Sequence, residues 1–249
     1  MWTNKEESGS RREKYKRFIK ECRFHISLSL LVFVLFLTQA SIQRKIMLAF
    51  RYYDGTAVIK AIESDTVHIF QKAIFPSLTY LMSFSYLVIY ICAICLTFLI
   101  LIYYRQTLLF KRFSLMFSLN YLIAFPFFML FNVSIAGASL QTVQPLMYEQ
   151  FPRIFSIITT IDPLDNCFPS LHVAMVLSAF LIIRGTNFKR YKIFLYFAFP
   201  TIVFSVLYLG IHWITDVFAG MALAFFTYYA AKSFCESSHP ISSGTSENL

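Results

Sequence analysis

The sequence predicts an all-α polytopic membrane protein, built as a bundle of six transmembrane helices. Of its 249 residues 57% are hydrophobic, 18% are aromatic and only 14% are charged, a balance far from that of an ordinary soluble domain. Apolar runs of roughly 20 residues, enough to cross a bilayer, recur along the chain. The predicted spans are 24–43, 75–104, 114–138, 170–187, 191–211 and 213–232. Little chain remains for a soluble domain, so any chemistry must come from helix ends and loops.

The basic residues indicate how the spans are oriented. They gather before the first span, between the second and third, between the fourth and fifth, and after the sixth. The positive-inside rule places these four segments in the cytoplasm, together with both termini. The formal charge of +9 follows the loops and is not interleaved with aromatic residues on one face. We therefore expect a membrane protein that binds no nucleic acid.

Three parts are expected along the chain. Residues 1–23 are polar and read as a cytoplasmic basic tail that can lie against anionic headgroups. Residues 24–232 form the membrane domain, with the functional motifs within 140–220, and residues 233–249 are expected to be a disordered tail. The first apolar run, Ile26 to Ala40, could also be a signal peptide, but the long, partly acidic segment before it favours an uncleaved span.

The segment from Thr56 to Ile74 is too polar to be a span. Its apolar residues alternate with charged ones, which indicates an amphipathic helix in the outer interface. Such a helix can help lipids reach a site at the membrane surface, or it can simply cap the bundle.

The cysteines predict neither a disulfide on the outer side nor a metal centre. Cys92 and Cys95 lie within an apolar span and read as small hydrophobic residues, which leaves Cys167 as the only outer cysteine. No cofactor is expected.

The first candidate site element is the start of the fourth span. Pro169 favours a helix start, with Asn166 nearby as a possible cap. Ser170 and His172 would then lie in the first turn, where unpaired N–H groups and the helix dipole favour a bound phosphate.

A second such element begins the sixth span. His212 and Asp216 are four residues apart, so on a helix they share one face and the carboxylate can orient the imidazole. Because both helix starts are expected on the outer side, we predict that they form one site.

Two imidazoles that converge on an anion site suit phosphoryl transfer. A nucleophilic histidine needs a carboxylate on its other nitrogen, which Asp216 can supply to His212. His172 has Val176 one turn away and suits the role of general acid, while Ser170 can hold phosphoryl oxygens. On spacing alone, a proton or ion pathway is equally possible, because charged groups inside membranes also mark such pathways.

A cation is also needed to hold the phosphate. The loop at 139–168 leads into the Pro169 helix and contains a single Lys or Arg, Arg153. Arg153 is therefore the candidate phosphate clamp, with an exposed arginine of no catalytic role as the alternative.

These motifs resemble the type 2 phosphatidic acid phosphatase superfamily. The resemblance rests on Phe-Pro-Ser-Leu-His at 168–172 and on Ser205, His212 and Asp216, and it covers roughly 140–232. It implies a six-helix bundle with a metal-independent site that acts on a phospholipid or another lipid phosphate. It also implies that His212 is phosphorylated with Asp216 as its partner, that His172 protonates the leaving group and that Ser170 contacts the phosphate.

The chain departs from the family pattern in three ways. The usual first motif, a Lys followed by Arg-Pro, is absent, and the Arg expected after Ser205 is Val206. Two phosphate clamps are thus missing, with Arg153 as the first replacement and Lys72 or Lys60 behind it. The variant Pro-Ser-Leu-His resembles the branch that contains inositol phosphorylceramide synthases, which transfer a phosphorylated headgroup to a lipid alcohol.

Three functions follow from the sequence. The first is a lipid phosphatase that acts through a phosphohistidine on the extracytoplasmic face. The second is a phosphotransferase that moves a headgroup between lipids, because an alcohol can replace water when water is excluded. The third is a non-catalytic transporter or scaffold that kept the fold.

Overall fold

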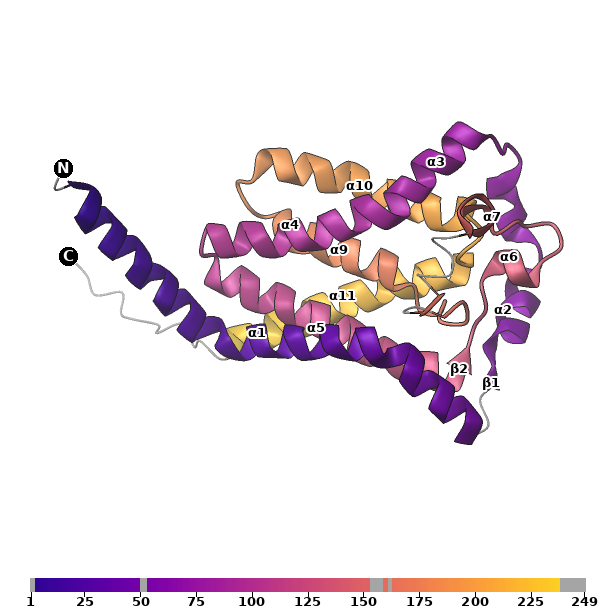
Figure 1. Ribbon diagram of the computed structural model, residues 1–249, viewed down its shortest axis with the longest axis horizontal. Coiled ribbons are helices and arrows are strands. Elements are labelled where there is room, and N and C mark those ends of the chain that lie inside the picture. Colours follow the sequence, from indigo (N-terminus) through magenta and orange to yellow (C-terminus); the bar gives the residue numbers. More distant parts are fainter. Residues whose placement is uncertain (1–2, 50–52, 153–158, 161–162, 238–249) are drawn as a thin grey trace, which may run out of the picture.

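The computed structural model describes residues 3–49, 53–152, 159–160 and 163–237. About 81% of the described residues are helical, and Figure 1 shows how the helices are arranged. The α-helices are α1 (Thr3–Ala49), α2 (Gly55–Glu63), α3 (Pro76–Phe84), α4 (Tyr90–Tyr103), α5 (Thr107–Leu130), α6 (Ala136–Ser139), α7 (Leu146–Gln150), α9 (Leu171–Ile183), α10 (Lys189–Tyr208) and α11 (Ile214–Ser237). A 3-10 helix η1 (Thr66–Gln71), a π-helical turn η2 (Ser85–Ile89) and two short parallel strands, β1 (Tyr53–Asp54) and β2 (Phe131–Asn132), complete the described elements.

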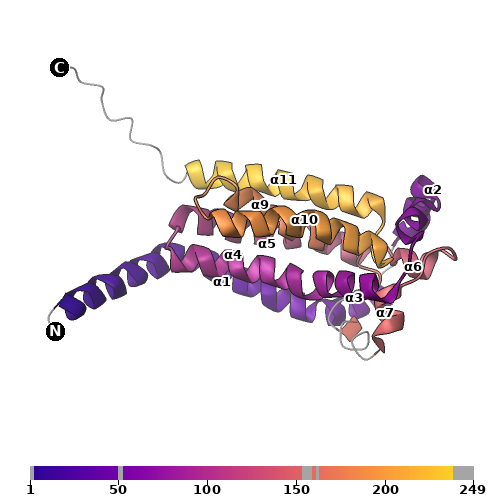
Figure 2. The same ribbon diagram turned by 90° about the horizontal axis from the view of Figure 1, so that it is seen from above.

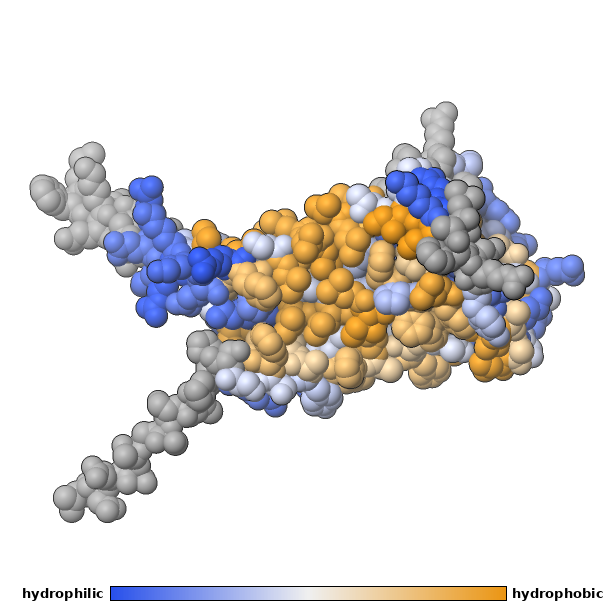
Figure 3. Space-filling view, turned by 90° about the horizontal axis from the view of Figure 1, so that it is seen from below, coloured by the Kyte–Doolittle hydropathy of each residue, from blue (hydrophilic) through white to orange (hydrophobic). Residues whose placement is uncertain are grey.

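The long helices pack side by side around α9 (Figures 1 and 2). α9 contacts α4, α5, α10 and α11. It is apolar all round and buries ten of its thirteen residues, as expected of a helix enclosed by others. The outer helices expose large apolar side chains, and Figure 3 shows these as an apolar band between two hydrophilic ends.

Among the described residues, five helical segments are long and apolar enough to cross a membrane. They are Arg12–Ile46, Pro76–Tyr103, Thr107–Leu130, Lys189–Tyr208 and Ile214–Ser237. The fourth predicted span, 170–187, corresponds to the shorter apolar helix α9. At a rise of 1.5 Å per residue α9 is roughly 20 Å long, less than the ~30 Å hydrocarbon core. The prediction of six spans is therefore not confirmed, and α9 is instead a central helix shielded by its neighbours.

Helices α1 and α11 run past the two predicted boundaries of the membrane domain, which stay predictions. The basic segment before residue 24 and the first span form one continuous helix, α1, whose first part leaves the bundle (Figure 1). At the other end α11 continues to Ser237, beyond the predicted boundary at residue 232. The rest of the predicted C-terminal tail lies outside the described residues.

The prediction of a single amphipathic helix over 56–74 is wrong. Ser64 has a φ of 52°, a left-handed conformation that ends α2 before η1 begins. α2 caps the end of the bundle where α11 starts, and it buries Ile59 and Glu63. Glu63 therefore faces inward rather than toward the headgroups.

Candidate active site

The two predicted helix starts meet at one end of the bundle. The backbone N–H of Ser170 donates to the carbonyl of Asp216 at 3.1 Å. This close approach requires Gly220, because a Cβ there would collide with the Ser170 carbonyl. The structure thus brings the two motifs together, while the catalytic roles of their residues remain predictions.

His212 lies in a turn before α11, not on its face as the sequence analysis expected. Gly210 has a φ of 69°, a conformation that glycine adopts without steric cost. Val206, at the position where the family has arginine, is fully buried and accepts at its carbonyl the N–H of His212 at 3.0 Å. The turn therefore fixes the backbone of His212 from the preceding helix.

His212 and Asp216 nevertheless form the expected pair. Nδ1 of His212 lies 3.2 Å from Oδ2 of Asp216, and that oxygen also accepts the N–H of Trp213 at 2.8 Å. Asp216 is the third residue of α11, so it caps the helix as acidic residues do at this position. Both side chains are buried, and Oδ1 of Asp216 has no hydrogen-bond partner among the described residues. The pair leaves Nε2 of His212 for chemistry.

His172 is held between two tyrosine rings. Its ring centroid lies 4.2 Å from those of Tyr86 and Tyr90 and 6.0 Å from that of His212. The tyrosines come from η2 and the start of α4, and sequence reasoning missed them. Their spacing of four residues within an apolar run was the only available signal. The two histidine rings are therefore close enough to act on one bound group.

Ser170 is the N-cap of α9, so the helix begins two residues later than the prediction from Pro169. Its Oγ accepts the N–H of Val173 at 3.5 Å. Asn166 is not the cap and instead bridges with Val133. No described residue accepts a hydrogen bond from the amides of Leu171 or His172. No described residue therefore blocks the first amides of α9, and an anion could bind to them.

The start of α11 is occupied. Oε2 of Glu63 accepts the N–H of Ile214 at 3.0 Å, and Oε1 accepts the N–H of Thr215. The sequence had placed Glu63 on the polar side of a surface helix, but a carboxylate satisfies free amides and the positive end of the helix dipole. Of the two predicted anion sites, this one is filled by the protein itself.

The loop before α9 is anchored by a buried carboxylate. Asp165 accepts hydrogen bonds from the side-chain amides of Gln43 at 3.0 Å and Asn132 at 3.1 Å. Burial raises the pKa of Asp165, and these two donors oppose that effect. α1, through Gln43, and β2, through Asn132, thus fix the loop that carries Ser170.

The candidate clamps do not complete the site among the described residues. Arg153 lies outside them. Lys60 is exposed and donates to the carbonyl of Ser139 at 3.2 Å, and Lys72 is exposed. Within the described ranges, no Lys or Arg makes a polar contact with the two histidines, Asp216 or Ser170.

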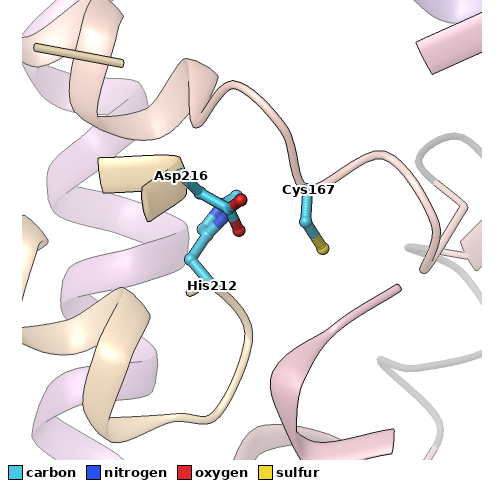
Figure 4. Close-up of side chains that lie close together, drawn as sticks. All are labelled: Cys167, His212 and Asp216. Carbon is cyan, nitrogen blue, oxygen red and sulfur yellow. The ribbon is translucent and has the colours of Figure 1, made fainter. Parts of the chain in front are cut away.

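Cys167 adds an unexpected donor beside the pair (Figure 4). Cys167, His212 and Asp216 each offer one ligand atom, and these atoms lie within 4.8 Å of one another. Thiolate, imidazole and carboxylate are all zinc ligands, and three protein ligands are typical of catalytic zinc sites. The thiol donates to the carbonyl of Ile211 at 3.3 Å. These three residues could therefore hold a metal.

Comparison with known proteins finds a match to one protein family. The family model described as the PAP2 superfamily matches residues 115–238, which include His172, His212 and Asp216. No curated protein and no solved structure matches the chain, so the resemblance to the inositol phosphorylceramide synthase branch is not confirmed. The long apolar helices of this chain fit an integral membrane protein. Residues 115–238 carry a PAP2 superfamily domain, which suggests a phosphatase or phosphotransferase that acts on lipid phosphates.

Proposed function

We propose that this protein is an integral membrane lipid phosphatase that acts through a phosphohistidine at His212. The observation that carries the proposal is the buried pair of His212 and Asp216 beside His172. Asp216 holds Nδ1 of His212, which directs Nε2 toward the substrate and stabilises the ring as charge develops.

The proposed reaction has two steps. In the first, Nε2 of His212 attacks phosphorus, the bond to the lipid oxygen breaks, and His172 gives that oxygen a proton. In the second, His172 takes a proton from water as the water attacks phosphorus, which breaks the P–N bond and releases phosphate. The two rings, with centroids 6.0 Å apart, can flank one phosphoryl group.

The phosphate would bind at the start of α9. The amides of Leu171 and His172 and the hydroxyl of Ser170 are the donors there, and the helix dipole favours the negative charge. We propose that Arg153 supplies the missing cation. Arg153→Ala should raise KM more than it lowers stability, and unchanged kinetics would remove Arg153 from the site.

Burial of the site supports a second candidate, a phosphotransferase. Ser170 and Asp216 are fully buried and His212 is 4% exposed, and a site that excludes water favours an alcohol as the acceptor. The intermediate is the same, and only the second step differs.

A product balance tests these functions. Purified full-length protein is incubated with phosphate-labelled lipids, with and without diacylglycerol or ceramide, beside His212→Ala. We expect label in inorganic phosphate, whereas label in the acceptor would make the protein a transferase. The matched control is His68→Ala, because His68 is an exposed histidine at the same end that contacts the carbonyl of Thr142. Wild-type activity in His212→Ala would overturn the mechanism, and no product in any arm would favour a non-catalytic protein.

Metal independence is part of the proposal and has its own test. Activity should survive EDTA, because His212 itself is the nucleophile. The opposite result would be that EDTA removes the activity, that Zn²⁺ restores it in the wild type, and that Zn²⁺ does not restore it in Cys167→Ser. That result would assign the reaction to a metal held by Cys167, His212 and Asp216.

The active site is proposed to face the extracytoplasmic side, since the basic segments lie at the opposite end of the bundle. A cysteine introduced at exposed Glu149, in α7, should react with an impermeant maleimide added outside intact cells. Reaction only after permeabilisation would reverse the orientation.

A further inference from the structure

A charged cavity lies at the end of the bundle opposite the histidines, where α1 crosses the turn between α4 and α5. It has a volume of about 420 Å³ and is lined by Lys14, Arg17, Phe18, Glu21, Arg105 and Thr107. Figure 3 shows a hydrophilic cluster where α1 leaves the apolar band. The mechanism proposed above uses none of these residues.

The cavity walls are fixed by packing. Phe18 is buried, and its ring meets that of Phe110 edge to face at 5.3 Å, which holds α1 on α5. The hydroxyl of Tyr15 donates to the carbonyl of Tyr103 at 3.1 Å, which holds α1 to the end of α4. These two contacts hold α1 against α5 and α4 beside the cavity.

Arg105 occupies a backbone position that usually belongs to glycine. Its φ is 53°, its N–H donates to Ile102, and the N–H of Gln106 donates to Leu101. These two bonds form a Schellman motif in which Arg105 is the left-handed residue. Because glycine would fit this turn with less strain, the turn itself does not explain an arginine.

The described residues satisfy the arginine side chain only in part. Its guanidinium lies over the ring of Tyr15 at 5.0 Å, and Nη1 is buried without a hydrogen-bond partner among those residues. A buried guanidinium N–H calls for an acceptor, and phosphate oxygens match its planar geometry.

The charge of the cavity also favours an anion. Its lining has three cations, Lys14, Arg17 and Arg105, and one carboxylate, Glu21. Glu21 pairs with Arg17 at 2.8 Å. Lys14 and Arg105 form no ion pair with a described acidic residue.

Exposed aromatic side chains next to Arg105 favour a lipid as the source of the anion. Tyr103 is 67% exposed and Tyr104 is 53% exposed. Tyrosines of this kind sit at the level of the headgroups in membrane proteins, and basic residues next to a span attract anionic lipids. A phospholipid can thus place its phosphate in the cavity and its acyl chains on the adjoining apolar surface.

We propose that this cavity is a binding site for the headgroup phosphate of an anionic phospholipid, with Arg105 and Lys14 as its main ligands. The site lies at the opposite end of the bundle from His212, so it does not depend on the proposed catalytic function.

The test measures lipid retention by the full-length protein. Delipidated protein in detergent is titrated with phosphatidylglycerol, and lipid adducts are counted by native mass spectrometry, with phosphatidylcholine as the neutral comparison. We expect phosphatidylglycerol to be retained preferentially. Equal retention of the two lipids would overturn the proposal, and so would displacement of the lipid by inorganic phosphate at equal concentration, because that would indicate a site for free anions.

Arg105→Gly separates binding from folding. This variant relieves the left-handed strain, so its thermal stability should equal or exceed that of the wild type, while phosphatidylglycerol affinity should fall about tenfold. Arg105→Gln and Lys14→Gln should lose affinity in the same direction. Lys189→Gln, which removes an exposed lysine from the start of α10, is the control and should bind as the wild type does. Wild-type affinity in both Arg105 variants would refute the assignment.

Discussion

Helices α9 and α11 both begin with backbone amides that lack a partner within the helix, but different groups accept hydrogen bonds from these amides. At α11 the first amides are taken by the carboxylates of Glu63 and Asp216. At α9 the described residues supply only the hydroxyl of Ser170. Both helices present the positive end of a dipole, so the difference lies in what the rest of the fold brings to each end. Among the described residues, the start of α11 is anchored by carboxylates, whereas the first amides of α9 have no acceptor.

This difference assigns separate tasks to the two motifs. In the proposed mechanism, the anchored start of α11 fixes Asp216 and, through it, the nucleophile His212. The amides at the start of α9 would bind the phosphate beside His172. A helix N-terminus in a sequence therefore predicts an anion site only when no acidic side chain of the same chain reaches it.

The largest expected effect comes from Asp216→Asn. The amide oxygen can still accept the N–H of Trp213, but the negative charge that stabilises the imidazole is lost, so kcat should fall by about 10²–10⁴. Initial rates and thermal unfolding measured together separate catalysis from folding. Asp65→Asn, a carboxylate of the same end that bonds Thr142, is the control. Turnover near the wild-type rate in Asp216→Asn would show that the start of α11 does not support catalysis through the charge of Asp216.

Glu63→Ala should leave the first amides of α11 without their carboxylate acceptor. Two amides lose a buried charged acceptor, so the free energy of unfolding should fall by about 2–3 kcal/mol. Added sulfate should recover more stability in this variant than in the wild type, because the anion can take the place of the carboxylate. The measurement is thermal unfolding with and without sulfate.

Glu149→Ala is the control for Glu63→Ala, since Glu149 is an exposed glutamate at the same end. Equal stability of Glu63→Ala and the wild type would show that Glu63 does not anchor α11.

Gly220→Ala should force the two starts apart. Its Cβ would collide with the carbonyl of Ser170, and overpacking of this kind costs about 1–3 kcal/mol. We also expect a lower kcat, because the hydrogen bond from Ser170 to Asp216 would lengthen. Gly185→Ala is the matched control, since a Cβ at Gly185 meets nothing within 4 Å. If both variants unfold at the wild-type temperature, close approach at Gly220 is not required.

The smallest effect is expected for Ser170→Ala. Loss of the N-cap should lower stability by about 1 kcal/mol, and loss of a phosphate donor should raise KM with less change in kcat. Ser170→Thr keeps the hydroxyl and should restore both values. A KM that stays at the wild-type value in Ser170→Ala would remove this hydroxyl from the phosphate site.

The sequence predicted the parts of the site that depend on short-range spacing. His212 and Asp216 are four residues apart and do pair, and Ser170 and His172 do lie at a helix start. The helix boundary was off at Pro169, because the cap is set by Ser170. Tyr86, Tyr90 and Glu63 were missed, because each reaches the site from a distant part of the chain.

The sequence by itself determined that this is a helical membrane protein and which residues carry the two motifs, since hydropathy and local spacing are written directly in the chain. Only the tertiary structure decided that α9 is a short central helix, that Ser64 breaks the segment after α1, and that Glu63 turns inward. Those outcomes depend on which helices surround α9 and on which amides lack a partner. Residues far apart in the chain bury this apolar surface and accept these hydrogen bonds, and such contacts leave no periodic pattern in the sequence.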